Sequence, residues 1–227
     1  MQADRTANIT ATPAFNIGRN TQTMHFRDLT IVLLLLSTNF SYGQKKFKVV
    51  ATETGRPSYS IVDEDGKLLR QLDTAKYFMC FNPDQYVHFA IVAMEGSSGW
   101  PAIDADEKIL FEVYNTSFGE PSPDRLVENK IRIVDDRNLI GFANNKGQVI
   151  IKPQFEFATS FHKGKSIIGK SCEKVPWDEH ADESNCHHFS IVCEKHGYIN
   201  DQGAILKLGE FSFEQIVKEI EWKDPDK

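Results

Sequence analysis

One turn motif recurs four times along this chain, and its nearly constant spacing limits the folds available. The copies align without a gap as YSIVDEDGKLL (59–69), WPAIDADEKIL (100–110), IGFANNKGQVI (140–150) and HGYINDQGAIL (196–206). The residues that open the turns, spaced by 41, 40 and 56, are Asp63, Asp104, Asn144 and Asn200. A period of about 40 residues with one insertion predicts a stacked repeat array rather than one hairpin of an enzyme core.

Each copy predicts a β-hairpin. Alternating residues before the turn, such as Tyr59 and Ile61, are typical of a half-buried strand. Glycine takes positive φ without steric cost, and three copies carry it at the same place in the turn, as Gly66, Gly147 and Gly203. The second copy has Glu107 there, so its turn is expected to be strained or differently shaped. An apolar strand is expected after each turn, and Pro153 is expected to end the third of these.

The second half of the period repeats less well but predicts a third short strand. The segment SFHKGKSII (160–168) matches RLVENKIRI (125–133), with Phe161 aligned to Leu126 and Gly164 aligned to Asn129. Each unit is therefore expected to be a hairpin followed by one further strand.

Helical periodicity appears at the C-terminal end. Apolar residues share one helical face there: Phe213, Ile216, Val217 and Ile220. Ser212 and Gln215 have the spacing of a capping box. The segment predicts a helix that caps the last repeat, and an amphipathic helix for a partner protein is the alternative.

The fold class that follows is all-β, an array of about four repeats of about 40 residues with a short C-terminal capping helix. The boundaries expected are 44–97 for a first, divergent repeat and 98–210 for the following repeats, which hold an insertion at 171–188. Residues 211–227 form the cap and tail.

These motifs resemble the WG-repeat proteins of bacteria. The unit of that family resembles (W)GYI-(D/N)-x-x-G, an apolar pair, P-x-(Y/F), a spacer and F-x-x-G-x-A, and residues 141–164 follow it closely. The resemblance extends well over 98–206 and weakly over 46–97. The family's tryptophan is replaced by Ile140 and His196, and Trp100 is followed by Pro101. The resemblance implies a binding or interaction module rather than an enzyme.

The N-terminal 43 residues differ from the rest. From Met24, the segment 24–43 has the features of a secretory signal peptide: Arg27 near its start, an apolar stretch over 29–36, and small residues before a cleavage point. That stretch is shorter than the roughly 20 residues that a transmembrane helix needs. Residues 1–23 are interpreted as an over-long N-terminal extension. The mature protein is expected in the periplasm or outside the cell, without stable membrane insertion.

The charge balance argues against nucleic acid as a partner. The chain carries 26 Lys and Arg residues against 32 Asp and Glu residues, a formal net charge of −6. Neutralisation of phosphates by a basic surface supplies most of the affinity in nucleic-acid binding. A protein or envelope glycan is the expected partner.

Two cysteines flank the insertion, and in an exported protein Cys172 and Cys186 are candidates for a disulfide at its base. Four cysteines allow three pairings, and the residues alone leave the choice open. Cys193 and Cys80 are interpreted as buried thiols. The weaker alternative is a zinc or copper site in the insertion, with the ligand set Cys172, His180, Cys186 and His188. Its spacing matches no compact metal motif, so no metal or other cofactor is expected.

The candidate contact residues are aromatic: Trp177 in the insertion, Trp100 and Tyr198 in the repeats. No nucleophile elbow, phosphate-binding glycine loop or metalloprotease motif is present in the sequence. The function expected is therefore a non-catalytic binding module of the bacterial cell envelope. The alternative is a carbohydrate-active or metal-dependent enzyme that uses the acidic Cys/His insertion at 172–193, with Glu179 and Asp182 as its carboxylates.

Overall fold

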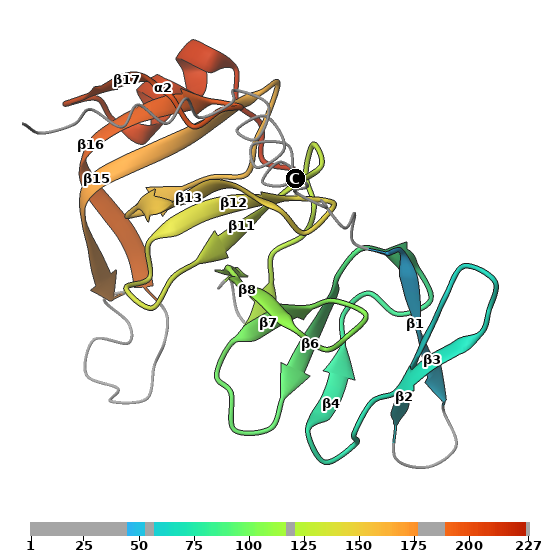
Figure 1. Ribbon diagram of the computed structural model, residues 1–227. Helices are drawn as coiled ribbons and strands as arrows, with labels where there is room; N and C mark the ends of the chain where they lie inside the picture. Colours follow the sequence, from blue (N-terminus) through green and yellow to red (C-terminus); the bar gives the residue numbers. More distant parts are fainter. Residues whose placement is uncertain (1–44, 53–56, 117–120, 177–188, 226–227) are drawn as a thin grey trace, which may run out of the picture. The chain divides into compact units, whose positions relative to one another are not determined.

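The computed structural model describes residues 45–52, 57–116, 121–176 and 189–225 (Figure 1). Antiparallel strands make up nearly all of the regular structure in these residues. The described residues also contain one helix, α2 (Phe213–Ile220), at the C-terminal end. The all-β class with a C-terminal helix is confirmed. The expected extension, the signal peptide and most of the insertion lie outside these residues.

The strands form three larger sheets and one two-stranded ribbon. The first sheet has the order β3 (Leu68–Gln71), β2 (Ser58–Val62), β1 (Phe47–Thr52) and β5 (Tyr86–Val87). The second has the order β13 (Val149–Phe155), β12 (Ile140–Asn144), β11 (Lys130–Val134), β8 (Ile109–Val113), β7 (Trp100–Ile103), β6 (Ala90–Met94) and β4 (Tyr77–Cys80). The third consists of β14 (Phe157–Ala158), β15 (Lys165–Pro176), β16 (Phe189–Asn200) and β17 (Ile205–Gly209). The ribbon pairs β9 (Asn115–Thr116) with β10 (Ser122–Pro123).

The four predicted turns share one hydrogen-bonding pattern, which we call the Asx turn. Oδ1 of the opening Asp or Asn accepts the backbone N–H groups two and four residues further on, at 2.8–3.1 Å. The third residue after the opening one has φ between 61° and 79° in all four turns. A short side-chain carbonyl is needed to reach these N–H groups, which explains why only Asp and Asn open the turns.

The Asx turn that contains Glu107 has the same shape as the others, so the expectation of a different shape is wrong. Glu107 holds φ at 61°, in the left-handed region that disfavours a side chain. Its carboxylate lies 3.5 Å from Nε of Arg70 and 3.9 Å from Nζ of Lys76. The strain expected at this position is therefore present, and two ion pairs accompany it.

A fifth Asx turn, absent from the sequence alignment, joins β11 to β12. Oδ1 of Asp135 accepts the N–H groups of Arg137 and Leu139 at 3.1 and 2.8 Å, and Asn138 holds φ at 61°. Asn replaces Gly at the left-handed position, and the turn lies only nine residues before Asn144. Because of these two differences from the other turns, a repeat period of about 40 residues does not predict this turn.

The match between the second halves of two units is confirmed by their turns. Glu128 and Asn129 hold φ at 49° and 60°, and Lys163 and Gly164 hold φ at 51° and 70°. In each case the two flanking residues exchange backbone hydrogen bonds of 2.8–3.1 Å. Two successive positive φ values between such residues define a type I′ hairpin turn.

These two type I′ turns link one unit to the next. The carboxylate of Glu128 accepts the backbone N–H groups of Lys163 and Gly164 at 2.6 and 3.0 Å. Nζ of Lys163 in turn lies 3.0 Å from the carboxylate of Glu221, the residue that ends α2. Glu128 and Lys163 occupy the same place in their units, so equivalent turns of two neighbouring repeats contact each other. The ion pair between Lys163 and Glu221 extends this row of contacts to the end of α2.

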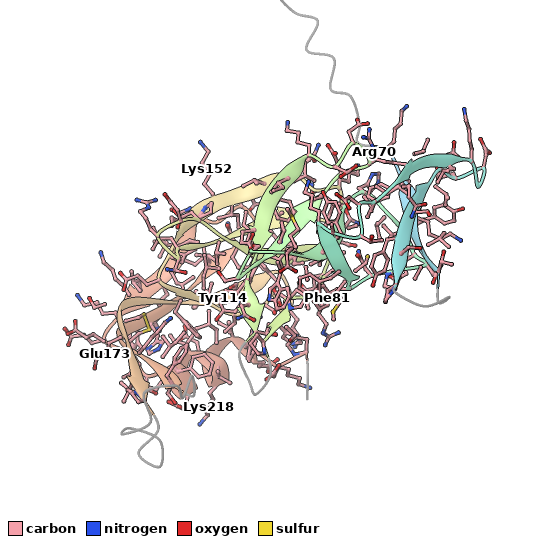
Figure 2. All side chains as sticks on the ribbon, turned by 90° about the horizontal axis from the view of Figure 1, so that it is seen from below. Arg70, Phe81, Tyr114, Lys152, Glu173 and Lys218 are labelled. Carbon is pink, nitrogen blue, oxygen red and sulfur yellow. A yellow bond between two sulfur atoms is a disulfide. The ribbon has the colours of Figure 1, made fainter. Side chains whose placement is uncertain are left out.

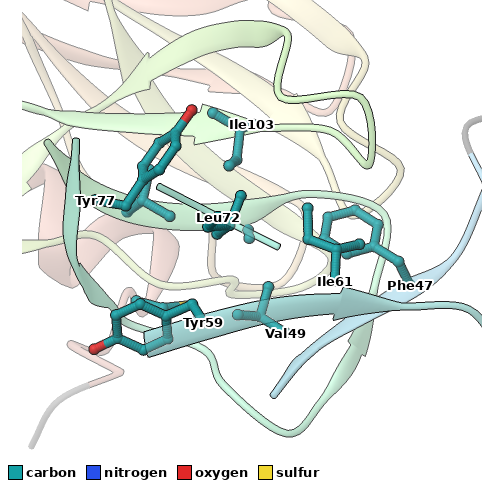
Figure 3. Packing of buried hydrophobic residues seen from close by; sticks show 10 residues of the cluster. Phe47, Val49, Tyr59, Ile61, Leu72, Tyr77 and Ile103 are labelled. Atoms are coloured by element: carbon teal, nitrogen blue, oxygen red, sulfur yellow. The ribbon is translucent and has the colours of Figure 1, made fainter. Parts of the chain in front are cut away.

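The hydrophobic core is divided into clusters rather than gathered in one place. The first joins Phe47, Val49 and Ile61 of the first sheet to Tyr77 and Ile103 of the second, as Figure 3 shows. Two more clusters follow along the chain, and a fourth lies under α2. A core distributed in this way is expected of stacked units, because each buries its apolar face against its neighbours.

Helix α2 covers the end of the third sheet. Ser212 and Gln215 form the predicted capping box, with hydrogen bonds of 3.2 and 2.8 Å. Ile216 and Ile220 are buried against Ile167 of β15. The apolar face of the helix therefore packs within the chain through Ile216 and Ile220, with Phe213 and Val217 partly buried, which supports a capping role.

Hairpins of neighbouring units touch at equivalent positions. A Cβ built on Gly203, three residues after Asn200, would lie 2.9 Å from Cγ2 of Ile151, seven residues after Asn144. Arg70, seven residues after Asp63, meets Glu107, three residues after Asp104, in the same way. The outer strand of one hairpin thus packs against the turn of the next.

Gly203→Ala is expected to lower the free energy of unfolding more than Gly66→Ala. Both glycines hold φ at 79°, which costs an alanine about 1–2 kcal/mol. Gly66 has no atom within 4 Å of a built Cβ, whereas Gly203 has the Ile151 side chain, so overpacking adds about 1 kcal/mol there. Urea denaturation of the two variants measures the difference, and equal losses would contradict the contact between units.

Candidate functional site

Trp100, a predicted contact residue, makes its contacts with other side chains of the same chain. It is half-buried on β7, its ring centroid lies 4.8 Å from that of Phe81, and Nε1 donates to Oδ1 of Asn115 at 3.2 Å. The equivalent residues of the other hairpins are buried: Tyr59 at 8%, Ile140 at 1% and His196 at 9% exposure. This position is a core position of the repeat, which explains why Ile and His replace Trp.

Tyr198, the second candidate, lies on β16 beneath the capping helix. It packs against the cluster of Ile167 and Ile216, and its hydroxyl group is 3.5 Å from Oε1 of Glu219. Nζ of Lys165 lies 5.2 Å from the centre of the ring. Tyr198 therefore belongs to a cluster different from that of Trp100, and the structure does not bring the two together. Trp177 lies outside the described residues.

The glycine of the WG motif has a direct structural role. A Cβ on Gly141 would lie 2.5 Å from the carbonyl oxygen of Ile151, and one on Gly197 would lie 1.8 Å from that of Lys207. In these two hairpins the outgoing strand crosses so close to the incoming strand that no side chain fits. Pro101 stands at this position in the second unit, which lacks the glycine.

The disulfide joins Cys172 to Cys193, not to Cys186 as predicted. Strand β15 continues through Cys172 to Pro176, so the first residues of the predicted insertion are strand. Cys172 stands directly opposite Cys193 in the register with β16, and their Cα atoms are 4.0 Å apart. The interpretation of Cys193 as a buried thiol is likewise wrong.

The disulfide removes Cys172 from the ligand set of the alternative metal site. A disulfide sulfur is not the thiolate that binds zinc or copper. The other proposed ligands, His180, Cys186 and His188, lie outside the described residues. Among the residues that the structure describes, no group of three His, Cys, Asp or Glu side chains is placed to hold a metal ion.

Cys80 is buried, as predicted, and is the free cysteine of the described chain. Burial raises the pKa of its thiol to about 11. At neutral pH the group is therefore protonated, which makes it a poor nucleophile.

The most buried ion pair joins Asp124 to Arg132. Nε and Nη2 of Arg132 each donate to the carboxylate at 2.9 Å, and the backbone N–H of Arg132 donates to it at 3.0 Å. The guanidinium carbon lies 4.5 Å from the centre of the Tyr114 ring. Burial raises the pKa of Tyr114, and the Arg132 charge opposes that shift. Nη1 also donates to the carbonyl of Ala158 at 3.3 Å, so the group links two units and has the character of a structural clamp.

An exposed aliphatic residue recurs at one position of the repeat, five residues after the residue that opens each predicted turn. The exposed fractions there are 58% for Leu68, 53% for Ile109, 46% for Val149 and 54% for Ile205. The next residue is exposed as well in three units: Leu69, Ile150 and Leu206. The sequence predicts that these residues form an apolar strand after each turn, and nothing in it indicates that they are exposed. We call the four residues the aliphatic positions.

The backbone at the aliphatic positions is unpaired on its outer side within the described chain. Strands β3, β13 and β17 each stand at the end of their sheet. The remaining outgoing strand, β8, pairs with β11 only through Glu112 and Val113, so Ile109 has no partner there. Unpaired strand edges with apolar side chains are characteristic sites of association.

The turns beside the aliphatic positions differ in charge. The first two turns, over 63–67 and 104–108, read DEDGK and DADEK, whereas the last two, over 144–148 and 200–204, read NNKGQ and NDQGA. Asp201 of the last turn is paired, with Nζ of Lys130 at 2.6 Å. An acidic surplus thus adjoins the aliphatic positions of the first two units.

No helix within the described chain is long and apolar enough to cross a membrane. Comparison with curated proteins and with solved structures found no match. Among protein-family models, residues 140–170 match the WG containing repeat. This segment includes β12, β13 and the type I′ turn, so it is the third hairpin and the strand after it that carry the resemblance to WG repeats.

Proposed function

We propose that this protein is an exported, non-catalytic interaction module of the bacterial cell envelope, and that it binds a partner protein through the four aliphatic positions. The observation that carries the proposal is their recurrence: Leu68, Ile109, Val149 and Ile205 are each about half exposed at one place in the repeat. Isolated exposed aliphatic residues are ordinary on protein surfaces. An exposed aliphatic residue at the same structural position in four units favours a shared role in binding.

The pairs of consecutive exposed residues strengthen this argument. The second residue of each pair is the extra residue of a β-bulge: Leu69, Ile150 and Leu206 fall where the register with the incoming strand shifts by one residue. Leu68 and Leu69 are 58% and 41% exposed, and Ile205 and Leu206 are 54% and 52% exposed. A partner that covers these exposed residues removes apolar surface from water.

A protein partner is favoured over a glycan by the type of side chain. Sugars stack on aromatic rings, but Phe78 and Tyr86 are the exposed aromatic residues among the exposed large hydrophobic side chains of the described chain. Apart from Met79, the rest of that set is aliphatic. Aliphatic side chains bind by burial in a complementary apolar surface, which another protein provides.

Export is supported by two independent features. The segment 24–43 has the pattern of a secretory signal, and the disulfide between Cys172 and Cys193 is compatible with an oxidising compartment.

Site-specific photo-crosslinking tests the proposal. A photoreactive phenylalanine at position 68, 109, 149 or 205 is expected to capture one and the same protein in the native host. Position 218 is the control, because Lys218 is exposed on α2 and belongs to none of the outer strands (Figure 2). Capture at 218 as strong as at the four positions would contradict the proposal.

A fourfold serine variant, L68S/I109S/V149S/I205S, adds an affinity measurement on the captured partner. Each side chain buried in a contact contributes about 1.5–3 kcal/mol, or at least a tenfold change in Kd. Circular dichroism checks that the variant is folded, which is expected because the four residues are exposed. Unchanged affinity of the folded variant would exclude these residues as the contact surface.

A further inference from the structure

Strand β3 offers the most open edge among the outgoing strands. All four of its residues, 68–71, are exposed, and it stands at the end of the first sheet. The outer strands β13 and β17 have residues that are partly or fully buried. Arg70 extends from this strand at the surface (Figure 2). Leu68, Leu69 and Gln71 are therefore open to an incoming segment, whereas the side chain of Arg70 lies against the turn of the next hairpin.

The hydrogen bonds of β3 leave backbone groups directed outward. Leu72 donates its backbone N–H to the carbonyl of Tyr59 at 2.9 Å, and the neighbouring pair in the register is Ser60 with Gln71. Bonded and non-bonded pairs alternate along an antiparallel ladder. The N–H and C=O groups of Gln71 are thus directed away from β2, toward an edge that no described strand occupies.

The turn beside this edge, DEDGK over 63–67, carries three acidic residues and one basic residue. Glu64 and Asp65 of the adjoining turn are exposed, and the side chain of Asp106, from the next turn, is 89% exposed. Arg70 lies 3.7 Å from Asp106 and 3.5 Å from Glu107, so part of the local positive charge is already paired. The edge combines aliphatic side chains with negative charge.

We propose that the free edge of β3 binds an extended peptide segment that alternates aliphatic residues with Lys or Arg, as a fifth strand of the first sheet. The backbone groups of Gln71 bond to the peptide, Leu68 and Leu69 contact its aliphatic residues, and the acidic turns attract its basic residues. This inference rests on the proposed function, since it names the chemistry of the partner at one of the four aliphatic positions.

A second copy of this chain is a poorer occupant of the same edge. Antiparallel pairing of β3 with β3 would bring the acidic turn over 63–66 of one copy near Asp73, which follows β3 in the other copy, and like charges repel across a strand pair. The edge of β17 is a poorer site for a basic peptide, because Asp201 beside it is paired with Lys130.

Titration of the full chain with labelled synthetic peptides tests the proposal by fluorescence anisotropy. The probe is the peptide KLKLKLK, and ELELELE is its control of opposite charge. We expect saturable binding of the first that weakens as salt is added, and none of the second. A KLKLKLK peptide with alternate backbone nitrogens methylated is expected to lose binding, because methylation removes the N–H donors that a β-ladder requires.

Matched variants locate the binding. Leu69→Lys is expected to weaken binding of KLKLKLK at least tenfold, and Asp65→Lys several-fold with a smaller salt dependence. Leu206→Lys is the matched control, since Leu206 holds the same place in the last unit and is 52% exposed; binding there should be unchanged. Equal affinity of the wild type and Leu69→Lys would overturn the proposal.

Hydrogen exchange identifies the bonded strand. The amide of Gln71 is expected to exchange fast in the free protein and slowly with KLKLKLK bound. Protection in the free protein would show that another segment or copy already occupies the edge, which also overturns the proposal. Crosslinking at positions 109, 149 and 205 separates this failure from that of the proposed function, because those positions would still capture the partner.

Discussion

Arg132→Met is expected to lower the free energy of unfolding by about 3–5 kcal/mol, the largest loss that we predict for a single substitution. The reason is the charge left behind. Asp124 is 5% exposed, and its carboxylate accepts three hydrogen bonds from Arg132. Removal of the guanidinium leaves a buried carboxylate with one backbone donor from residue 132. Urea denaturation followed by circular dichroism measures the loss.

Arg137 provides the matched control for this prediction. Its Nη2 lies 2.9 Å from Oδ2 of Asp135, the same distance as in the buried pair, but the Arg137 side chain is 69% exposed. Because solvent screens an exposed pair, Arg137→Met is expected to change stability little. Similar losses in the two variants would show that burial does not govern the effect.

The double variant Asp124→Leu/Arg132→Met separates the unpaired charge from the lost pair. Replacing both partners of a buried ion pair by apolar residues removes the uncompensated charge. The double variant is therefore expected to regain part of the stability that Arg132→Met loses. A double variant that is less stable than Arg132→Met would indicate that the pair itself, rather than the isolated carboxylate, makes the larger contribution.

Removal of the disulfide by Cys172→Ser/Cys193→Ser is expected to cost about 3 kcal/mol, the second largest effect. The bond joins residues 21 apart in sequence, and it limits the conformations of the unfolded chain. The variant should also show no response to reductant, whereas the wild type should fall to the stability of the variant when reduced. Urea denaturation with and without reductant measures both.

Cys186→Ser distinguishes the observed pairing from the one predicted by sequence. With Cys172 bonded to Cys193, the stability of the oxidised protein is expected to remain unchanged in this variant. A loss of about 3 kcal/mol, abolished by reductant, would instead assign the bond to Cys172 and Cys186.

Much of the fold was predictable because its signals are local. Asp or Asn followed three residues later by Gly produces the same Asx turn at Asp63, Asn144 and Asn200, with no help from distant residues. The capping box of α2 is equally local. The turn at Asp135 escaped prediction because Asn138 replaces the glycine, and asparagine tolerates positive φ well enough to form the same turn.

The candidate site was predicted less well, because it depends on which side chains the fold leaves uncovered. Trp100 was selected as an aromatic contact residue, but its position in the repeat faces a core cluster. Leu68 and Ile205 belong to the apolar strands predicted after the turns, and each is exposed because its strand stands at the end of a sheet. Hydrophobicity alone does not distinguish an apolar residue in a central strand from one in an edge strand.

The sequence by itself determined the turns, the hairpins and the C-terminal helix, since hydrogen bonds over two to four residues and the φ of single residues specify them. Only the tertiary structure decided three further matters: the pairing of Cys172 with Cys193, the core position of Trp100, and the exposure of the aliphatic positions. Each of these depends on strand register and on neighbours distant in the sequence. Register brought the two sulfur atoms together, and the absence of a described strand beyond β3 and β17 left their aliphatic residues exposed.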